Sequence, residues 1–224
     1  MTREQVIFIV TGQTEAIGTG VAMTTVRYSR NGNELWHYTY NSPVSGGNAY
    51  GSDVESIGRL IYISGYSNEE NTQQSEGIIV GIDSAGAFRW KTSYAARFGN
   101  FTSQNTPSDM KVDKFGRAYV SATAKDSAFG IGNNFMLIIA DAFGNAYVST
   151  YNSTFSDFTS AVAISNRYTV VTGHSDTTGQ SSDMLTTAFG YGSGMFRNIR
   201  HKSIDPFGLR TDTFGTRNCS RKLW

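Results

Sequence analysis

The sequence predicts an all-β protein made of four tandem antiparallel repeats, and two spacings carry this prediction. Four apolar runs each end in a small residue, at positions 53, 57 and 51 residues apart: Gly12, Gly65, Ala122 and Gly173. A turn glycine follows each run about twenty residues later: Gly32, Gly86, Gly144 and Gly194. Periods of about fifty residues are typical of propellers and solenoids. The expected fold is therefore a β-propeller of about four four-stranded antiparallel blades.

The third copy shows most clearly how one repeat divides into strands. We expect its strands at 110–112, 117–122, 135–140 and 145–151, because runs rich in Val, Ile, Tyr, Phe and Thr are bounded there by Gly, Asn and Asp. The second strand of each copy is apolar at nearly every position, which indicates that both of its faces are covered. No stretch has the periodicity of a long helix.

A recurring Asp-x-x-Gly pattern predicts the tight turns between these strands. The hairpin turns assigned to it lie at 83–86, 113–116, 141–144 and 205–208. The Asp side chain accepts hydrogen bonds from nearby backbone N–H groups, and the Gly takes the positive φ that closes a hairpin. These aspartates are therefore interpreted as turn formers.

One domain is expected over 1–208, with repeats at about 6–52, 53–108, 109–158 and 159–208, followed by an irregular basic tail at 209–224. The first copy has no obvious first strand. Segment 203–208 has the pattern of such a strand with its turn, and would close a small ring by pairing with the first copy. The irregular tail instead favours an incomplete or fragmentary propeller, part of a larger one. Both interpretations stay open, with a slight preference for the fragment.

The repeat resembles the bacterial SBBP family, the seven-bladed β-propeller repeat, whose pattern joins Asp-x-x-Gly-Asn, an apolar run ending in Thr-Gly, and a later Gly followed by Trp. The closest matches are 113–122, the turn 83–86 with Trp90, and Asn31-Gly32 with Trp36. Val148 and Asn198 occupy the places where these tryptophans would recur. The resemblance covers about 6–200 and implies a bacterial surface or secreted module, hence an extracellular or cell-surface location, without defining a function.

Composition excludes several classes of partner. A net charge of +1 and 17% charged residues give no general attraction to nucleic acid. No apolar run approaches the length of a membrane span, so no membrane insertion is expected, and no targeting segment is recognisable. The single cysteine, Cys219, leaves no internal disulfide and no multi-cysteine metal site. No cofactor and no metal are expected.

Three residues are weak candidates for a ligand site: Asp53, Asp109 and His174. Each Asp follows a serine at the expected entrance to a first strand, the strand that lines the channel of a propeller. Two carboxylates near one channel mouth would hold a cation or act as acid and base, whereas local backbone hydrogen bonding at a strand start is the favoured alternative. His174 lies in an expected loop after the second strand of the fourth copy, where a solvated position is favoured.

Other polar and aromatic features have simpler interpretations. Glu69, Glu70 and Glu76 are expected in a solvated polar loop. Trp36 and Trp90 are expected to pack between neighbouring repeats rather than to form a stacking platform.

Two functions follow from this pattern. The first is a non-catalytic binding or scaffold module for a protein or carbohydrate ligand, since loops vary while strands keep step. The second is a carbohydrate-active hydrolase or lyase at the channel mouth, using Asp53 and Asp109. The first is favoured because the chain has no catalytic motif. Open edges of an incomplete ring would also promote self-association.

Overall fold

The computed structural model describes residues 8–16, 20–69, 75–94, 97–98, 101–102, 104–126, 132–151, 156–177, 180–190 and 196–201. Within these ranges every regular element is a β-strand, which confirms the all-β prediction. The strands form four antiparallel sheets of three or four strands, and β8 (Arg97–Phe98) pairs with β9 (Phe101–Thr102) in a small fifth one. In each large sheet, consecutive strands along the chain are neighbours.

Sheet 1 contains β1 (Phe8–Ala16), β2 (Gly20–Tyr28) and β3 (Glu34–Tyr40). Sheet 2 contains β4 (Ala49–Ile57), β5 (Leu60–Ser67), β6 (Glu76–Asp83) and β7 (Phe88–Tyr94). Sheet 3 contains β10 (Gln104–Val112), β11 (Ala118–Asp126), β12 (Gly132–Ala140) and β13 (Ala146–Tyr151). Sheet 4 contains β14 (Asp157–Ile164), β15 (Tyr168–Thr177), β16 (Gln180–Gly190) and β17 (Phe196–His201).

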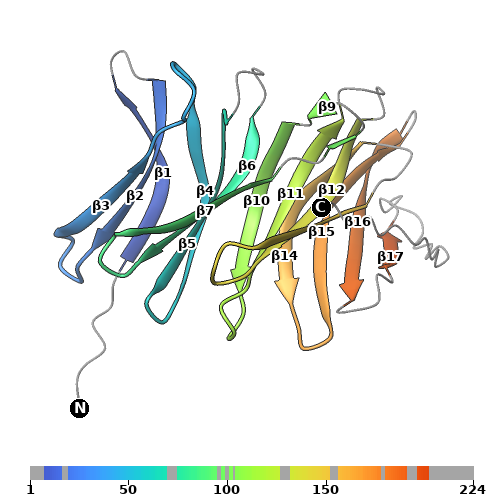
Figure 1. Ribbon diagram of the computed structural model, residues 1–224. Coiled ribbons are helices and arrows are strands. Elements are labelled where there is room, and N and C mark those ends of the chain that lie inside the picture. The colour runs from blue at the N-terminus through green and yellow to red at the C-terminus, as the bar shows by residue number, and fades with distance from the viewer. Residues whose placement is uncertain are drawn as a thin grey trace.

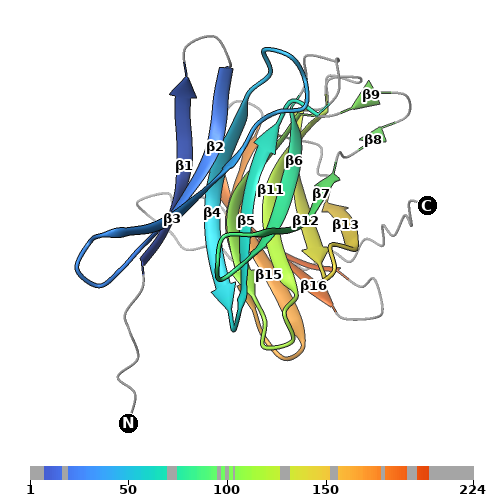
Figure 2. The ribbon, with the colours of Figure 1, turned by 60° about the vertical axis from the view of Figure 1, so that its left-hand side comes forward.

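The four sheets stand side by side in chain order, with sheet 1 at one end of the row and sheet 4 at the other (Figure 1). In a view turned by 60°, sheet 1 again lies beside sheet 2 (Figure 2). Strand β4 lies between β1 and β10, and β10 lies between β4 and β14. The first strands of sheets 2, 3 and 4 therefore follow one another along one side of the row.

A separate apolar core fills each gap between neighbouring sheets. Sheets 1 and 2 meet around Met23, Ile61, Ile63 and Val80. Sheets 2 and 3 meet around Tyr62, Ile79, Val120 and Ile138. Sheets 3 and 4 meet around Tyr119, Phe135, Val171 and Leu185. Strands β5 and β11 are buried at nearly every described position, as their continuous apolar runs predict. Strand β1 holds the same place in the repeat as β5 and β11. It differs from them because one of its faces is exposed.

The Asp-x-x-Gly turns form as predicted in the described part of the chain. In the turn at 141–144, one carboxylate oxygen of Asp141 accepts the N–H groups of Phe143 at 2.8 Å and Asn145 at 2.9 Å. Gly144 has a φ of +88°. Asp83 and Asp113 form the same pair of bonds. The fourth turn, at 205–208, and the tail at 209–224 lie outside the described residues.

The strands expected in the third copy are confirmed in order, but the first three are longer: the second ends at Asp126 and the third begins at Gly132. The first strand begins at Gln104 rather than at 110, because its pairing with β11 continues across a β-bulge between Pro107 and Asp109. A bulge tolerates the missing N–H of proline within a strand.

Candidate functional site

The two candidate carboxylates occupy equivalent positions in the middle of their strands, which corrects the expectation that they stand at strand entrances. Asp53 lies at the bulge of β4 and Asp109 at the bulge of β10. The equivalent bulge in β14 carries Ala161. A bulge opens the ladder and re-aims a side chain, and here it directs each carboxylate toward the next sheet.

Asp53 and Asp109 connect three sheets through backbone hydrogen bonds. Asp53 accepts the N–H of Val54 at 2.7 Å and, across the gap, the N–H of Met110 at 2.9 Å. Asp109 accepts the N–H of Met110 at 3.0 Å and that of Val162 in sheet 4 at 2.8 Å. All four carboxylate oxygens are therefore engaged, and the structure does bring the two aspartates together at one backbone group.

Lys111 supplies a positive charge beside this pair. Its ammonium lies 3.1 Å from Asp109 and 3.1 Å from Glu55. Burial raises the pKa of Asp53 above its ordinary value of 3.8, and the neighbouring Asp109 carboxyl adds to the rise. The Met110 and Val54 N–H groups and Lys111 act in the opposite direction without cancelling it.

Two tryptophans connect neighbouring sheets at the turns, which confirms the prediction that they pack between repeats. The Trp36 indole N–H donates to the Ser84 carbonyl at 3.1 Å, and that of Trp90 donates to the Ala142 carbonyl at 2.9 Å. Each ring covers the turn glycine, so a Cβ on Gly86 or Gly144 would lie 2.9 Å from the indole. Arg27 also donates to the Ser84 carbonyl.

Strand register corrects the expected place at which these tryptophans would recur. Trp36 and Trp90 follow register shifts in β3 and β7, and β13 has no such shift. The structural equivalents are therefore Tyr147, opposite Ile139, and Arg197, opposite Ala188. Counting from the turn glycine had instead predicted Val148 and Asn198. The extra bulge residue accounts for the difference of one position.

The expectation of a solvated acidic loop is wrong for Glu69 and Glu76. The Glu69 side chain is only 6% exposed and forms an ion pair with Lys91 of sheet 2. Tyr40 of sheet 1 donates to Glu69 at 2.7 Å and accepts from Lys91 at 3.0 Å. Glu76 is buried as the first residue of β6, and Glu70 lies outside the described residues. No local pattern reveals this cluster, because its members meet only when sheets 1 and 2 pack.

Electrostatics keep the same cluster in one protonation state. Burial raises the pKa of Tyr40 to about 12, with the Glu69 carboxylate adding to the rise. Burial lowers the pKa of Lys91, but its hydrogen bonds to Glu69 and Tyr40 outweigh that effect and raise it overall. At neutral pH the tyrosine is neutral and the lysine is charged. The cluster is thus a structural tie between sheets 1 and 2.

His174 lies apart from the two aspartates. It is an exposed residue of β15, in a strand rather than in the expected loop, and its ring stacks on Phe158 with centroids 4.8 Å apart. Within the described ranges, no three His, Cys, Asp or Glu side chains gather as metal ligands.

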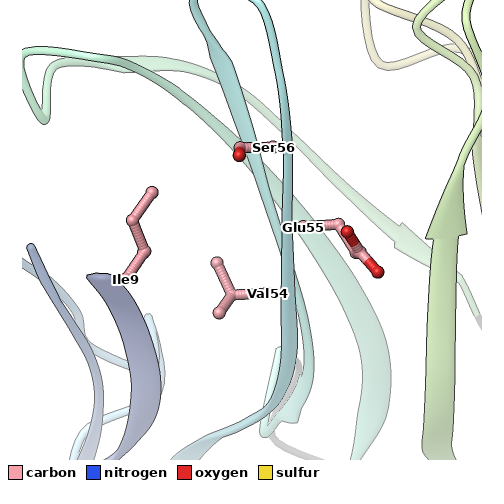
Figure 3. A pocket seen from close by; sticks show the side chains of 4 residues that line it. All are labelled: Ile9, Val54, Glu55 and Ser56. Carbon is pink, nitrogen blue, oxygen red and sulfur yellow. The ribbon is translucent and has the colours of Figure 1, made fainter. Parts of the chain in front are cut away.

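A small open depression lies where β1 meets β4, lined by Ile9, Val54, Glu55 and Ser56 (Figure 3). Ile9 and Val54 face each other across it, while Glu55 points to the other side of β4. Its volume of about 160 Å³ is below the roughly 300 Å³ at which small-molecule sites begin. It is a packing gap between two sheets rather than a ligand pocket.

The fold and these contacts define the class of protein: an all-β chain of antiparallel sheets tied together by recurring polar contacts. No protein-family model matches the chain, and no curated protein matches it either. The part of the chain that the structure describes has no helix long and apolar enough to cross a membrane.

Proposed function

We propose that the chain is a non-catalytic β-propeller repeat module of the SBBP type, acting as a rigid scaffold that binds a protein or carbohydrate ligand through its turns. The observation that carries the proposal is the full engagement of Asp53 and Asp109 by backbone N–H groups of successive sheets. These carboxylates serve the packing of the array, so the polar side chains best placed for chemistry already have structural partners.

The turns of sheet 3 supply a binding surface for this scaffold. Phe115 and Phe143 are 70% and 83% exposed at the tips of two Asp-x-x-Gly turns. A Cβ on Gly116 would touch the Cβ of Ala142, so the two turns are neighbours. The turn geometry does not require an aromatic residue there, because Ala85 takes the same place in sheet 2. Exposed aromatic rings are well suited to contact sugars or protein side chains.

A glycan array and a protein-interaction screen test this proposal. We expect a ligand that the wild-type chain binds and that the Phe115→Ser, Phe143→Ser double variant binds at least tenfold more weakly, roughly 1.4 kcal/mol. Thermal stability should not change, since both rings are exposed. Leu35→Ser, at a 53% exposed site on sheet 1, is the matched control. A folded chain without any ligand in either screen would contradict the proposal.

A carbohydrate-active hydrolase or lyase is the second candidate function. The raised pKa of Asp53 beside a second carboxylate favours it, because a pair of carboxyl groups with different proton affinities suits acid and base roles. Screening a polysaccharide panel with wild type and Asp109→Asn separates the two functions. Turnover by the wild type that Asp109→Asn abolishes would support the enzyme, whereas no turnover, or turnover that the variant retains, contradicts it.

A further inference from the structure

The three gaps between sheets all pair the same two kinds of face. In each gap, one sheet offers a receiving face formed by alternate residues of its second and third strands. In sheet 2 this face includes Ile61 and Ile63, opposite Ile82 and Val80. In sheet 3 it includes Ala118 and Val120, opposite Ala140 and Ile138. All eight residues are at most 2% exposed, because the preceding sheet covers them.

Sheet 1 has a receiving face that no described residue covers. Strands β1 and β2 hold the places of the second and third strands in sheet 1. The same register puts Phe8 opposite Tyr28 and Val10 opposite Val26. Phe8 and Val10 are 54% and 51% exposed, where their counterparts in sheets 2 and 3 are buried. An exposed apolar face of this kind marks an interaction surface.

The turn of sheet 1 next to this face has the backbone conformation of the two turns on which tryptophans pack, but no described tryptophan packs on it. Gly32 has a φ of +81°, close to the +84° and +88° of Gly86 and Gly144. The indole rings of Trp36 and Trp90 pack on those two glycines, whereas no atom of the described residues lies within 4 Å of a Cβ placed on Gly32. The backbone conformation that receives a side chain of a neighbouring sheet is thus present and open.

Sheet 4 presents the complementary covering face at the other end of the row. Met184, opposite His174, takes the place of Phe135, opposite Thr123 in sheet 3. Phe135 is fully buried against sheet 4, but Met184 is 51% exposed. Tyr168, three pleat repeats from His174 on the same face of β15, is 50% exposed.

We propose that copies of this chain associate head to tail, with the outward face of sheet 4 in one copy covering the outward face of sheet 1 in the next. The contact repeats, between two copies, an interface that the chain forms three times within itself. A second copy is the occupant because one chain carries both complementary faces, and these lie at opposite ends of the row (Figure 1). A heterologous contact of this kind closes into a ring or continues into a chain, depending on its rotation.

This inference rests on the proposed repeat scaffold and adds its partner. It also locates self-association on sheet faces, whereas the sequence had suggested open strand edges. By register, Arg197 takes the tryptophan position of sheet 4. At the bulge of β14, Ala161 takes the place of Asp53 and Asp109, so sheet 4 has no equivalent carboxylate there. The contact between copies therefore has fewer polar ties than the contacts within the chain, and we expect it to be reversible and dependent on concentration.

Sedimentation equilibrium of the full chain tests the proposal. We expect a weight-average mass that rises with concentration to at least twice the 24.5 kDa of one chain. Val10→Lys and Met184→Lys, each at an exposed site on one of the two faces, should each remain monomeric. Phe88→Lys, at a 54% exposed site of sheet 2 outside both faces, should associate like the wild type. Matching circular dichroism and melting temperatures establish that the variants fold.

Mixing the two monomeric variants separates head-to-tail association from other modes. Each variant keeps the face that the other lacks, so an equimolar mixture should form one-to-one dimers and nothing larger. Arg197→Trp should strengthen wild-type association at least tenfold, because the new indole would pack on Gly32 of the next copy. A wild type that stays monomeric at every concentration, or a mixture that stays monomeric, would overturn the proposal. A monomer that still binds a ligand would leave the proposed scaffold function standing.

Discussion

The Asp53 carboxylate of β4 accepts the backbone N–H of Met110 in β10 at 2.9 Å, and Asp109, one residue before Met110, extends the same contact to Val162 in β14. Neighbouring sheets are thus joined through a backbone group of one and a carboxylate of the other. Apolar packing is weakly directional, whereas these bonds define how far one sheet slides along the next.

Removing the Asp109 carboxylate should destabilise the contact between sheets 3 and 4. Asp109→Ala leaves the N–H of Val162, a residue only 3% exposed, without its acceptor, at a cost of about 2 kcal/mol in the free energy of unfolding. Asp109→Asn keeps one acceptor oxygen and should cost about half as much. Urea unfolding measures both values. The control is Asp176→Ala, at an exposed carboxylate, for which a change within about 0.5 kcal/mol is expected. Equal effects at the two sites would refute the structural role of Asp109.

Alanine substitutions at two turn glycines separate backbone strain from contact with tryptophan. Gly32→Ala should cost about 1 kcal/mol, because only the positive φ opposes a Cβ there. Gly144→Ala has the same backbone penalty, and its Cβ would also press on Trp90, adding roughly 1 to 3 kcal/mol. Both variants are compared by denaturant unfolding in the monomeric Val10→Lys background, so that association does not contribute. Equal losses would show that the Trp90 contact contributes nothing.

The ion pair between Glu69 and Lys91 should matter more than an exposed pair. Lys91→Met leaves the Glu69 carboxylate, 6% exposed, without its cation, so we expect a loss of about 3 kcal/mol. Adding Glu69→Gln should recover part of this loss. Arg89→Met breaks the pair with Asp83 at a side chain that is 57% exposed, and should cost less than about 1 kcal/mol. Chemical unfolding of the wild type, Lys91→Met, Glu69→Gln and the double variant gives the coupling free energy between the two side chains, and a value near zero would exclude a buried ion pair.

Two aspartates should affect the pH dependence of stability with opposite signs. Burial raises the pKa of Asp113, but hydrogen bonds from Arg117, Phe115 and Tyr119 outweigh it and lower the pKa below 3.8. The unfolded chain then binds more protons at this group, so its contribution to stability is present above pH 3.8 and is lost as the pH falls through the folded pKa. Asp113→Asn should therefore differ most from wild type at neutral pH, and the difference should narrow in acid.

Asp53 reverses this dependence because burial raises its pKa above 3.8. The folded protein binds more protons at this group, so its contribution is fully present below pH 3.8 and is lost as the pH rises through the raised folded pKa. The difference between wild type and Asp53→Asn should be largest in acid and smaller at neutral pH. Urea unfolding across this range measures both variants, and pH trends of the same sign would contradict the assigned environments.

The sequence alone determined the all-β class, the order of strands within a repeat and the Asp-x-x-Gly turns. Each depends on local chemistry: side-chain preference for extended backbone, hydrogen bonding within four residues, and the freedom of glycine at positive φ. Asp141 and Gly144 are examples, because the bonds they form were predictable from four consecutive letters. Confirming a propeller, by contrast, requires a closed ring of sheets, and a local pattern does not encode closure.

Only the tertiary structure decided which side chains meet between sheets. Asp53 and Met110 are 57 residues apart, and a bulge that no motif marked re-aims the carboxylate. Tyr40, Glu69 and Lys91 come together from two sheets, so a segment that looks solvated in the sequence contributes a buried carboxylate. Strands β3 and β7 each contain one bulge residue that β13 lacks, so the position in β13 equivalent to the two tryptophans is Tyr147. Such contacts depend on register and sheet packing, which are properties of the whole chain rather than of any short segment.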